Sequence, residues 1–419
     1  MAFQQGLSGL NTASKALDVI SNNVANSNTI GFKAGRAEFQ DVFAAALNGA
    51  ASGVQVGIGS AIGAVTQSFS QGNITTTNNP LDVAINGNGF FRMAAPDGTV
   101  AYTRNGQFDV NKDGFIVNSQ GFELTGFSAV NGVILAGATP KAIQLDFSDV
   151  QPSPSATMTL AMNLDSRDPV SPSFDPTNPT PLDRTNVTAG GYNFSTSATA
   201  YDTLGNAHTL SFFFQKTGAG TWNGYYQVDG TGNATAIPSP GSPLVFDNAG
   251  AITSGGQFNI TFPEFAGTGA SATQSIAFDL ADSTQFGSQF GVNTLRQDGF
   301  ASGRLTGITI GNDGVILGRY SNGQSRDLGQ VTLANFQSPN GLLSLGGNLW
   351  AESPDSGQPI IGAPGSANLG LLNAGSLEEA NVDLTAQLVQ LIVQQRAYQA
   401  NAQSVRAQDQ ILQTIVNLG

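Results

Sequence analysis

The C-terminal stretch from Ser376 to Leu418 contains neither glycine nor proline, and its apolar residues recur every three or four positions. A stretch of this kind is typical of one long helix. Ser376 followed by Glu379 fits a capping box at the start of that helix. The apolar residues fall on two sides, and a helix that is apolar on two sides needs a partner on each side.

Two stripes can be traced along this predicted helix. One runs from Val382 to Ile415. The other is interrupted by Gln395 and Asp409 and consists of Leu384, Leu388, Leu391, Tyr398, Val405, Leu412 and Val416. Both stripes are candidate interfaces.

A shorter amphipathic helix is predicted at the other end of the chain, from about Phe3. Its apolar stripe is formed by Leu10, Leu17, Ile20 and Val24. This helix can cover only one stripe of the long helix, so the second stripe implies contact with other copies of the chain. The alternative, in which both helices pack on the chain's own globular domain, stays open on pattern alone.

Between the two helices the sequence changes to short apolar alternations separated by Asn-Gly and Asp-Gly pairs, as in "PDGTVAYTRNGQFDVNKDGFIV". These pairs favour the positive φ angles of tight hairpin turns, so the middle of the chain is predicted to be β-rich. "FDVNKDGFIVNSQG" and "ITIGNDGVILGRYSNG" look like two versions of one hairpin unit.

A proline-rich stretch between Pro152 and Pro181 opens a further β-rich block that lasts to about Thr284. The fold class expected is multidomain, with a coiled-coil-like helical domain from the paired terminal helices and two nested all-β domains. The expected boundaries are 1–31 with 372–419 for the helical domain, 32–71 with 351–371 for a connector, 72–147 with 285–350 for an inner β-domain, and 148–284 for an inserted outer β-domain.

Composition excludes several classes of function. The net charge of -13 and only 16 Lys and Arg residues argue against a nucleic acid partner. With no cysteine, the chain has neither disulfides nor thiolate metal sites. No apolar run is long enough to insert in a membrane, and the first 30 residues lack the pattern of a cleaved secretory signal.

Sites of chemistry are not expected. "DVNKDG" (109–114) matches the opening of a calcium loop, but its twelfth position is Gln120, so a hairpin turn is the better interpretation. "GIGSAIG" (57–63) has the wrong spacing for a phosphate loop, and the only histidine, His208, has no catalytic partner nearby in sequence. We therefore predict no catalytic, cofactor or metal site, and no enzyme.

The stretch "LDVISNNVANSNTIGFKAGR" closely resembles the N-terminal signature of the bacterial flagellar rod and hook family. The C-terminal stretch and "NPLDVAINGNGFFRM" are also similar to segments of that family. The signature positions here are Asn22, Asn23, Ala25, Asn26, Thr29, Gly31, Phe32 and Lys33.

The resemblance implies a structural subunit that polymerises with itself into a helical tube, outside the cell, as part of the flagellum. It also implies export without a cleaved signal peptide, and contacts with rod protein, hook–filament junction protein, hook cap and export apparatus. The chain's length and large insert favour a hook subunit, a flexible universal joint that transmits torque to the filament. The alternatives are a distal rod protein of the same family or, from another class, a secreted β-rich adhesin.

Within this interpretation the signature segment is expected to be a hinge between the helices and the β-domains. Phe32 is expected to anchor the turn, and Lys33 and Arg36 to contact carboxylates of adjoining copies. Residues 44–63 are expected to form a flexible connector. The simpler alternative is that the signature only caps a helix.

Overall fold

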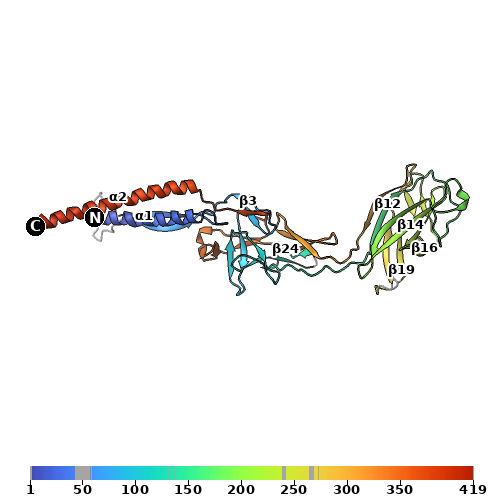
Figure 1. Ribbon diagram of the computed structural model, residues 1–419, viewed down its shortest axis with the longest axis horizontal. Coiled ribbons are helices and arrows are strands. Elements are labelled where there is room, and N and C mark those ends of the chain that lie inside the picture. Colours follow the sequence, from blue (N-terminus) through green and yellow to red (C-terminus); the bar gives the residue numbers. More distant parts are fainter. Residues whose placement is uncertain are drawn as a thin grey trace. The chain divides into compact units, whose positions relative to one another are not determined.

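The computed structural model describes residues 2–42, 57, 59–130, 132–135, 137–237, 242–263, 269–271 and 273–418. They form two compact units (Figure 1). Unit 1 contains residues 1–147, 307–319 and 325–419, and unit 2 contains residues 148–306 and 320–324. The domain boundaries expected from the sequence stay a prediction. Unit 2 continues past residue 284, the expected end of the outer β-domain, to residue 306.

Two long helices lie side by side in unit 1 (Figure 1): α1 (Ala2–Ala25) and α2 (Leu384–Leu418). They run antiparallel, since Asn23 near the end of α1 contacts Gln387 near the start of α2, whereas Gly6 meets Val405. No helix in the described part of the chain is long and apolar enough to cross a membrane.

A β-hairpin packs along α1. It consists of β1 (Gly35–Val42) and β2 (Gly59–Gln67), and the Ser60 amide donates to Ser8 Oγ at 2.8 Å. The expectation of a flexible connector is therefore wrong for residues 59–62, because each of them is paired with a residue of β1, and Gly63 lies at a β-bulge within the same strand. Of the other residues in the expected connector, 44–58, only Gly57 belongs to the part of the chain that the structure describes.

The predicted start of the C-terminal helix is also wrong. Ser376–Glu378 form a strand, β30, which pairs with β3 (Ile74–Thr76). α2 begins eight residues after Ser376, where Asp383 Oδ1 accepts the Ala386 amide at 3.1 Å and so caps the helix. The capping box is not formed, because the backbone of residues 376–378 is hydrogen-bonded to β3 instead.

The rest of unit 1 contains a large sheet with short accessory strands and a separate two-stranded sheet in which β4 pairs with β29. The main path of the large sheet is β22-β23-β24-β9-β5-β6-β27-β26. The strands are β4 (Val83–Asn86), β5 (Phe90–Ala94), β6 (Val100–Thr103), β7 (Asp109–Val110), β8 (Ile116–Val117), β9 (Glu123–Val130), β10 (Val133–Ile134), β11 (Lys141–Ala142), β22 (Leu305–Ile310), β23 (Val315–Tyr320), β24 (Ser325–Val331), β25 (Leu333–Asn335), β26 (Leu343–Gly346), β27 (Leu349–Ala351), β28 (Ile360–Gly362) and β29 (Leu371–Ala374), with one 3₁₀ turn, Pro339–Gly341.

The two hairpin units that look alike in sequence have the same turn geometry. In the first, the Asn111 amide donates to Phe115 O at 2.9 Å and Gly114 has a positive φ of 85°. In the second, the Gly311 amide donates to Val315 O at 2.8 Å and Gly314 has a φ of 80°. "DVNKDG" is thus part of a hairpin turn in this structure.

Unit 2 consists of two sheets packed face to face. One has the order β19-β20-β12-β21, and the other has the order β13-β14-β15-β17-β18, with β16 paired to β15. Residues of both sheets share one core, including Leu160, Phe212 and Trp222. The elements are β12 (Thr157–Asn163), a 3₁₀ turn (Val187–Ala189), β13 (Phe194–Tyr201), β14 (Ala207–Gly218), β15 (Thr221–Val228), β16 (Thr231–Ile237), β17 (Leu244–Phe246), β18 (Ile252–Ser254), β19 (Gln257–Pro263), β20 (Thr273–Asp279) and β21 (Gly291–Gln297).

Candidate functional site

The turn that follows α1 is held by short polar side chains of the signature segment. The Asn26 amide group donates to both the backbone and the side-chain oxygen of Asn22, at 3.0 and 2.9 Å. Asn26 Oδ1 in turn accepts the Thr29 hydroxyl at 3.2 Å. These contacts satisfy polar groups at the helix end and commit the chain to leave α1 at this point.

Asn23 is buried and joins three elements. Its Oδ1 accepts the Gly35 amide at 2.8 Å, and its Nδ2 donates to Gly35 O at 2.8 Å and to Gln387 Oε1 at 3.2 Å. The side-chain amide thereby pairs with β1 as another strand would, and it also bonds to α2. Asn23 fixes the position of both elements against α1.

Gly31 occupies a position that only glycine tolerates. Its φ is +71°, and a Cβ placed there would lie 2.5 Å from the Asn105 nitrogen. Its amide donates to Glu378 O at 2.8 Å. The chain can therefore approach both the 104–105 backbone and β30 closely.

A buried charge cluster lies directly after this glycine. The Lys33 ammonium donates to Glu378 Oε1 at 2.6 Å and to Ser70 O at 2.7 Å, and both the Lys33 and Glu378 side chains are fully buried. Arg104 Nη1 donates to Glu378 Oε2 at 3.2 Å, and the Gly72 amide donates to Oε1 at 2.9 Å. One carboxylate thus faces two cations away from solvent.

Burial dominates the electrostatics of this cluster. Loss of hydration lowers the pKa of Lys33, and the nearby Glu378 carboxylate opposes that shift. Burial also lowers the pKa of Arg104, again opposed by Glu378. Because the Lys33 side chain is completely enclosed by its own chain, the expectation that Lys33 contacts an adjoining copy is wrong. Arg36 is exposed, and its contact with another copy stays a prediction.

Asn381 extends the junction toward α2. Its Oδ1 accepts the Ala34 amide at 2.7 Å, and its Nδ2 donates to Ser68 O at 2.7 Å and to Ser70 O at 3.1 Å. The segment that leads into α2 is therefore bonded to both segments that flank the β1–β2 hairpin.

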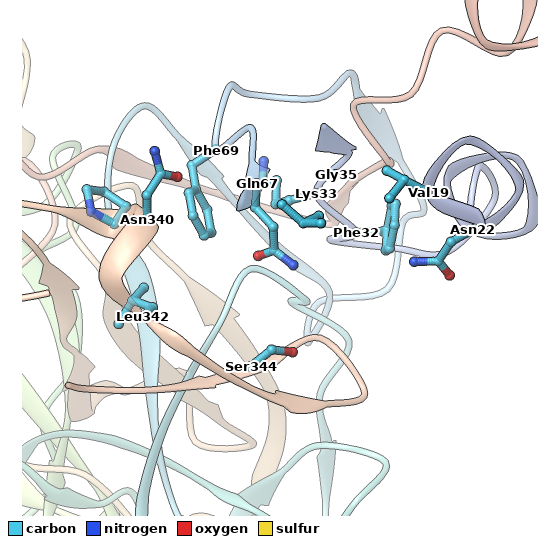
Figure 2. A pocket seen from close by; sticks show the side chains of 12 residues that line it. Val19, Asn22, Phe32, Lys33, Gly35, Gln67, Phe69, Asn340, Leu342 and Ser344 are labelled. Atoms are coloured by element: carbon cyan, nitrogen blue, oxygen red, sulfur yellow. The ribbon is translucent and has the colours of Figure 1, made fainter. Parts of the chain in front are cut away.

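A cavity of about 210 Å³ opens beside the junction (Figure 2). Val19 and Asn22 from α1 line one side, Phe32 and Lys33 follow, and Leu342 and Ser344 contribute from the segment around β26. Phe32 lines this cavity and is half-buried, so it contacts both the turn and the open space.

The seam between the helices contains glycines, side-chain amides and Val405. On α1, Gly6 and Gly9 approach α2 so closely that an added Cβ would meet Val405 and Asn401 at 2.9 and 2.7 Å. On α2 the half-buried amides recur every seven residues, at Gln387, Gln394, Asn401 and Gln408. The helices are close together, while Leu388, Val389, Ile392 and Val393 of α2 remain exposed.

The predicted interface residues are distributed unequally over this pair of helices. Ile20 is buried, and Leu10, Leu17, Val24, Leu391 and Val405 are half-buried. Leu384, Leu388, Tyr398 and Leu412 are exposed, and the Val416 side chain lies outside the described side chains. Val389 and Val393 of the second stripe are 57% and 54% exposed. Most large apolar residues of α2 thus face away from α1.

Sequence reasoning missed the residues that complete the junction: Arg104, Glu378, Asn381 and Gln387. The capping pattern places Glu378 at a helix start, where a carboxylate needs no buried partner. One available signal is its position in the alternating strand-like run "LLNAGSLE" of a chain that has few charges.

Four family models match the chain. They are described as Flagella basal body rod protein (residues 3–33), Flagellar hook protein FlgE/F/G D1 domain (84–154), Flagellar basal body protein FlaE D2 domain (163–300) and Flagellar basal body rod FlgEFG protein C-terminal (373–418). The first covers α1 and its turn, and the last covers α2. Together with the paired terminal helices and β-rich units, these matches define an axial protein of the bacterial flagellum.

Relatives place the chain more narrowly. The flagellar hook protein FlgE of Salmonella typhimurium is 42% identical and that of Escherichia coli K12 is 40% identical, each with all of both chains covered. The relative from Borreliella burgdorferi is 33% identical over all of this chain and 99% of its own. The chain belongs to the flagellar hook protein family, and it is a structural subunit of the hook.

A solved structure supports the fold. The flagellar hook protein FlgE2 of Helicobacter pylori matches with a TM-score of 0.51, covering 73% of this chain and all of that one, at 16% identity. Over the matched part, the fold of this chain is therefore shared with a hook protein whose sequence has diverged far from this one.

Proposed function

We propose that copies of this chain assemble into a helical homopolymer mainly through the outward faces of α2. The observation that supports this most directly is the exposure of Leu388, Val389, Ile392 and Val393, which are 45–57% exposed next to one another on the first turns of α2. Monomeric proteins rarely leave such a patch uncovered. Open-ended contacts between identical subunits then produce a filament.

Energetics favour assembly as the step that stabilises the helices. Complete burial of one Val, Leu or Ile side chain contributes about 1.5–3 kcal/mol, and the intrachain seam leaves most of these side chains in water. The seam instead uses glycines and amides such as Gly9 and Asn401. We propose that the terminal helices reach their full stability only when neighbouring copies cover α2, so that helix folding and assembly are linked.

The junction is proposed to be a fixed joint rather than a hinge. Lys33, Glu378 and Asn23 are buried and each bonds to segments far apart in the chain. Motion at this point would expose or separate buried charges, which is costly. In a hook that bends while transmitting torque, such a joint would transmit force from the helices to the β-sheets of unit 1.

The wider role rests on family membership. We propose that the subunit is exported through the flagellar export apparatus without a cleaved signal, and that it meets rod protein, cap and hook–filament junction protein at the ends of the polymer. We also propose that it has no enzymatic activity, which is supported by its membership of a family of structural subunits.

The assembly proposal can be tested with the double substitution Val389→Gln and Val393→Gln. The variant should be exported and should keep the thermal unfolding of its β-rich units, yet it should form no hooks visible by electron microscopy. The matched control, Val389→Ile with Val393→Ile, keeps the face apolar and should assemble. Hooks of ordinary length from the Gln variant would rule out this face as the principal contact.

A further inference from the structure

A row of side-chain amides runs along the side of α2 that faces α1. These amides recur every seven residues and are half-buried: Gln387, Gln394, Asn401 and Gln408. Positions with this spacing lie on nearly the same side of a helix, because two helical turns take about seven residues. The outward side of α2 instead carries exposed apolar residues, among them Val389, Ile392 and Val393. α2 therefore presents an amide row to its own chain and an apolar face to the outside.

Two contacts fix the register between the amide row and α1. Asn23 Nδ2 donates to Gln387 Oε1 at 3.2 Å. A Cβ added to Gly9 would lie 2.7 Å from Asn401 Nδ2. The two contacts are two heptads apart on both helices, so Gln394 lies opposite the residue midway between Asn23 and Gly9, which is an alanine. α1 thus meets these amides with one amide, one methyl group and one glycine.

The small residues of α1 suit the amides that they cover. Alanine and glycine reach only a short distance from the helix, so a long amide side chain can lie across the seam with its polar end at the edge, where water can hydrate it. Gln394 and Asn401 are half-buried rather than enclosed, as this arrangement requires. Gln387 has a protein partner instead, since Asn23 donates to it. Under α1, the amides therefore keep access to hydrogen-bonding partners.

The apolar face of another copy would cover the same row less favourably. Large side chains such as Val389 and Ile392 would enclose the amides and offer them neither donor nor acceptor. An amide that is buried without a partner costs free energy, and polar residues in one position of a helix seam are known to set register and partner choice for this reason. Contact with the outward face of α2 carries no such cost.

We propose that the amide row selects the partner of this side of α2. It makes α1 of the same chain the favoured cover, and it directs other copies to the outward apolar face. This inference rests on the proposed assembly through that outward face, and it adds the reason why other copies do not compete for the inner side. The residues that determine this specificity are Gln387, Gln394, Asn401 and Gln408.

A disulfide between the helices can report which chain covers the amide row. A Cβ added to Gly6 would lie 2.9 Å from Val405 Cγ2, and the Val405 Cβ is one bond further. The Cβ atoms of a disulfide lie about 3.5–4.5 Å apart, so Gly6→Cys with Val405→Cys should form one on oxidation. The chain has no other cysteine. A denaturing gel without reductant then separates disulfides within one chain from disulfides between two chains.

The test adds Gln394→Leu and Asn401→Leu to this cysteine pair in the full-length, unassembled subunit. The two leucines remove the cost of cover by another copy. At high subunit concentration, the ratio of interchain to intrachain disulfide should rise at least about tenfold over that with the native amides. Gln394→Asn, which keeps an amide at the same position, should leave the ratio unchanged.

The matched control is Gln403→Leu with Gln410→Leu. It replaces two amides at the same seven-residue spacing, but at exposed positions of α2, and its disulfide should stay within the chain. A seam variant with the native ratio, an equal rise in seam variant and control, or mainly interchain disulfide with the native amides would overturn the proposal. Because the unassembled subunit is used, the result is separate from that of the Val389→Gln and Val393→Gln test on hooks.

Discussion

The Lys33 ammonium lies 2.6 Å from the Glu378 carboxylate, although the two residues are 345 positions apart in the chain. This contact joins the segment after α1 to the strand before α2, inside a region that excludes solvent. Arg104 adds a second cation at 3.2 Å. The cluster therefore depends on the Glu378 carboxylate for its charge balance. The same carboxylate supports the joint between the helices and the β-sheets of unit 1.

Glu378→Gln should destabilise unit 1 by about 3–5 kcal/mol, because it leaves two buried cations without a counter-charge. Urea unfolding of the subunit labelled with 5-fluorotryptophan, followed through the fluorine NMR signal of Trp350 in unit 1, measures this loss. The neighbouring Glu379→Gln is the control and should cost about 0.5 kcal/mol or less. Equal effects of the two substitutions would contradict the importance of the cluster.

Gly31→Ala should be much more harmful than Gly98→Ala. Both glycines have a positive φ, which costs an alanine about 1–2 kcal/mol. A Cβ at Gly98 meets no atom within 4 Å, whereas one at Gly31 would lie 2.5 Å from the Asn105 nitrogen. The clash should add about 1–3 kcal/mol, measurable as a difference in urea midpoint, and similar midpoints would refute it.

Asn23→Ala should cost about 1–3 kcal/mol, since it leaves buried groups of Gly35 without their partner. In a double-mutant cycle with Gln387→Ala, the coupling energy should be at least about 0.5 kcal/mol, because the two amides share a hydrogen bond. Asn22→Ala, at the exposed neighbouring position, serves as the control and should show no coupling. Additive effects of Asn23 and Gln387 would mean that this bond is not made.

Unit 2 should lose stability in acid through Asp165. The Arg167 guanidinium donates to both of its oxygens, at 3.0 and 2.8 Å, and lowers the pKa of Asp165 to about 2. Since the folded pKa lies below the unfolded value of 3.8, the stabilisation is present above about pH 4 and is lost as pH falls through about 2. Asp165→Asn should remove it.

The difference between native unit 2 and Asp165→Asn should therefore be largest at neutral pH and vanish near pH 2. Arg167→Lys keeps the charge but not the two-point hydrogen bonding, so it should give an intermediate acid transition. Denaturant titrations at a series of pH values, followed through the signal of Trp222, give the stability of unit 2 as a function of pH. A constant difference from pH 7 to pH 2 would show that the ion pair does not control this transition.

Local features of this fold can be predicted from sequence. Gly114 and Gly314 follow polar residues in hairpin turns whose φ angles require them, and the repeated pattern around them is visible in the amino-acid sequence itself. The end of α1 can be predicted in the same way. Asn22 bonds to Asn26 at the helix end, and Gly31 supplies the positive φ of the turn that follows. Turn chemistry depends on near neighbours in sequence, so the sequence reveals it directly.

Contacts between distant segments could not be predicted in this way. Glu378 resembles a helix-cap carboxylate until β3 is seen to pair with its backbone, and "GIGSAIG" resembles a loop until β1 is placed beside it. The helix seam is also unexpected: the apolar stripes predict contact between α1 and α2, yet Gly9 and Asn401 meet there and most of the large side chains remain outside. Helical periodicity identifies apolar faces but not which partner covers each one.

The central claim, that the outward face of α2 is covered by neighbouring subunits, is tested most directly by cysteine labelling. The chain has no cysteine of its own, so Val389→Cys and Val393→Cys each introduce one unique thiol. Maleimide labelling should be rapid in the free subunit and at least about tenfold slower in assembled hooks. Labelling at equal rates in subunit and hook would contradict the account.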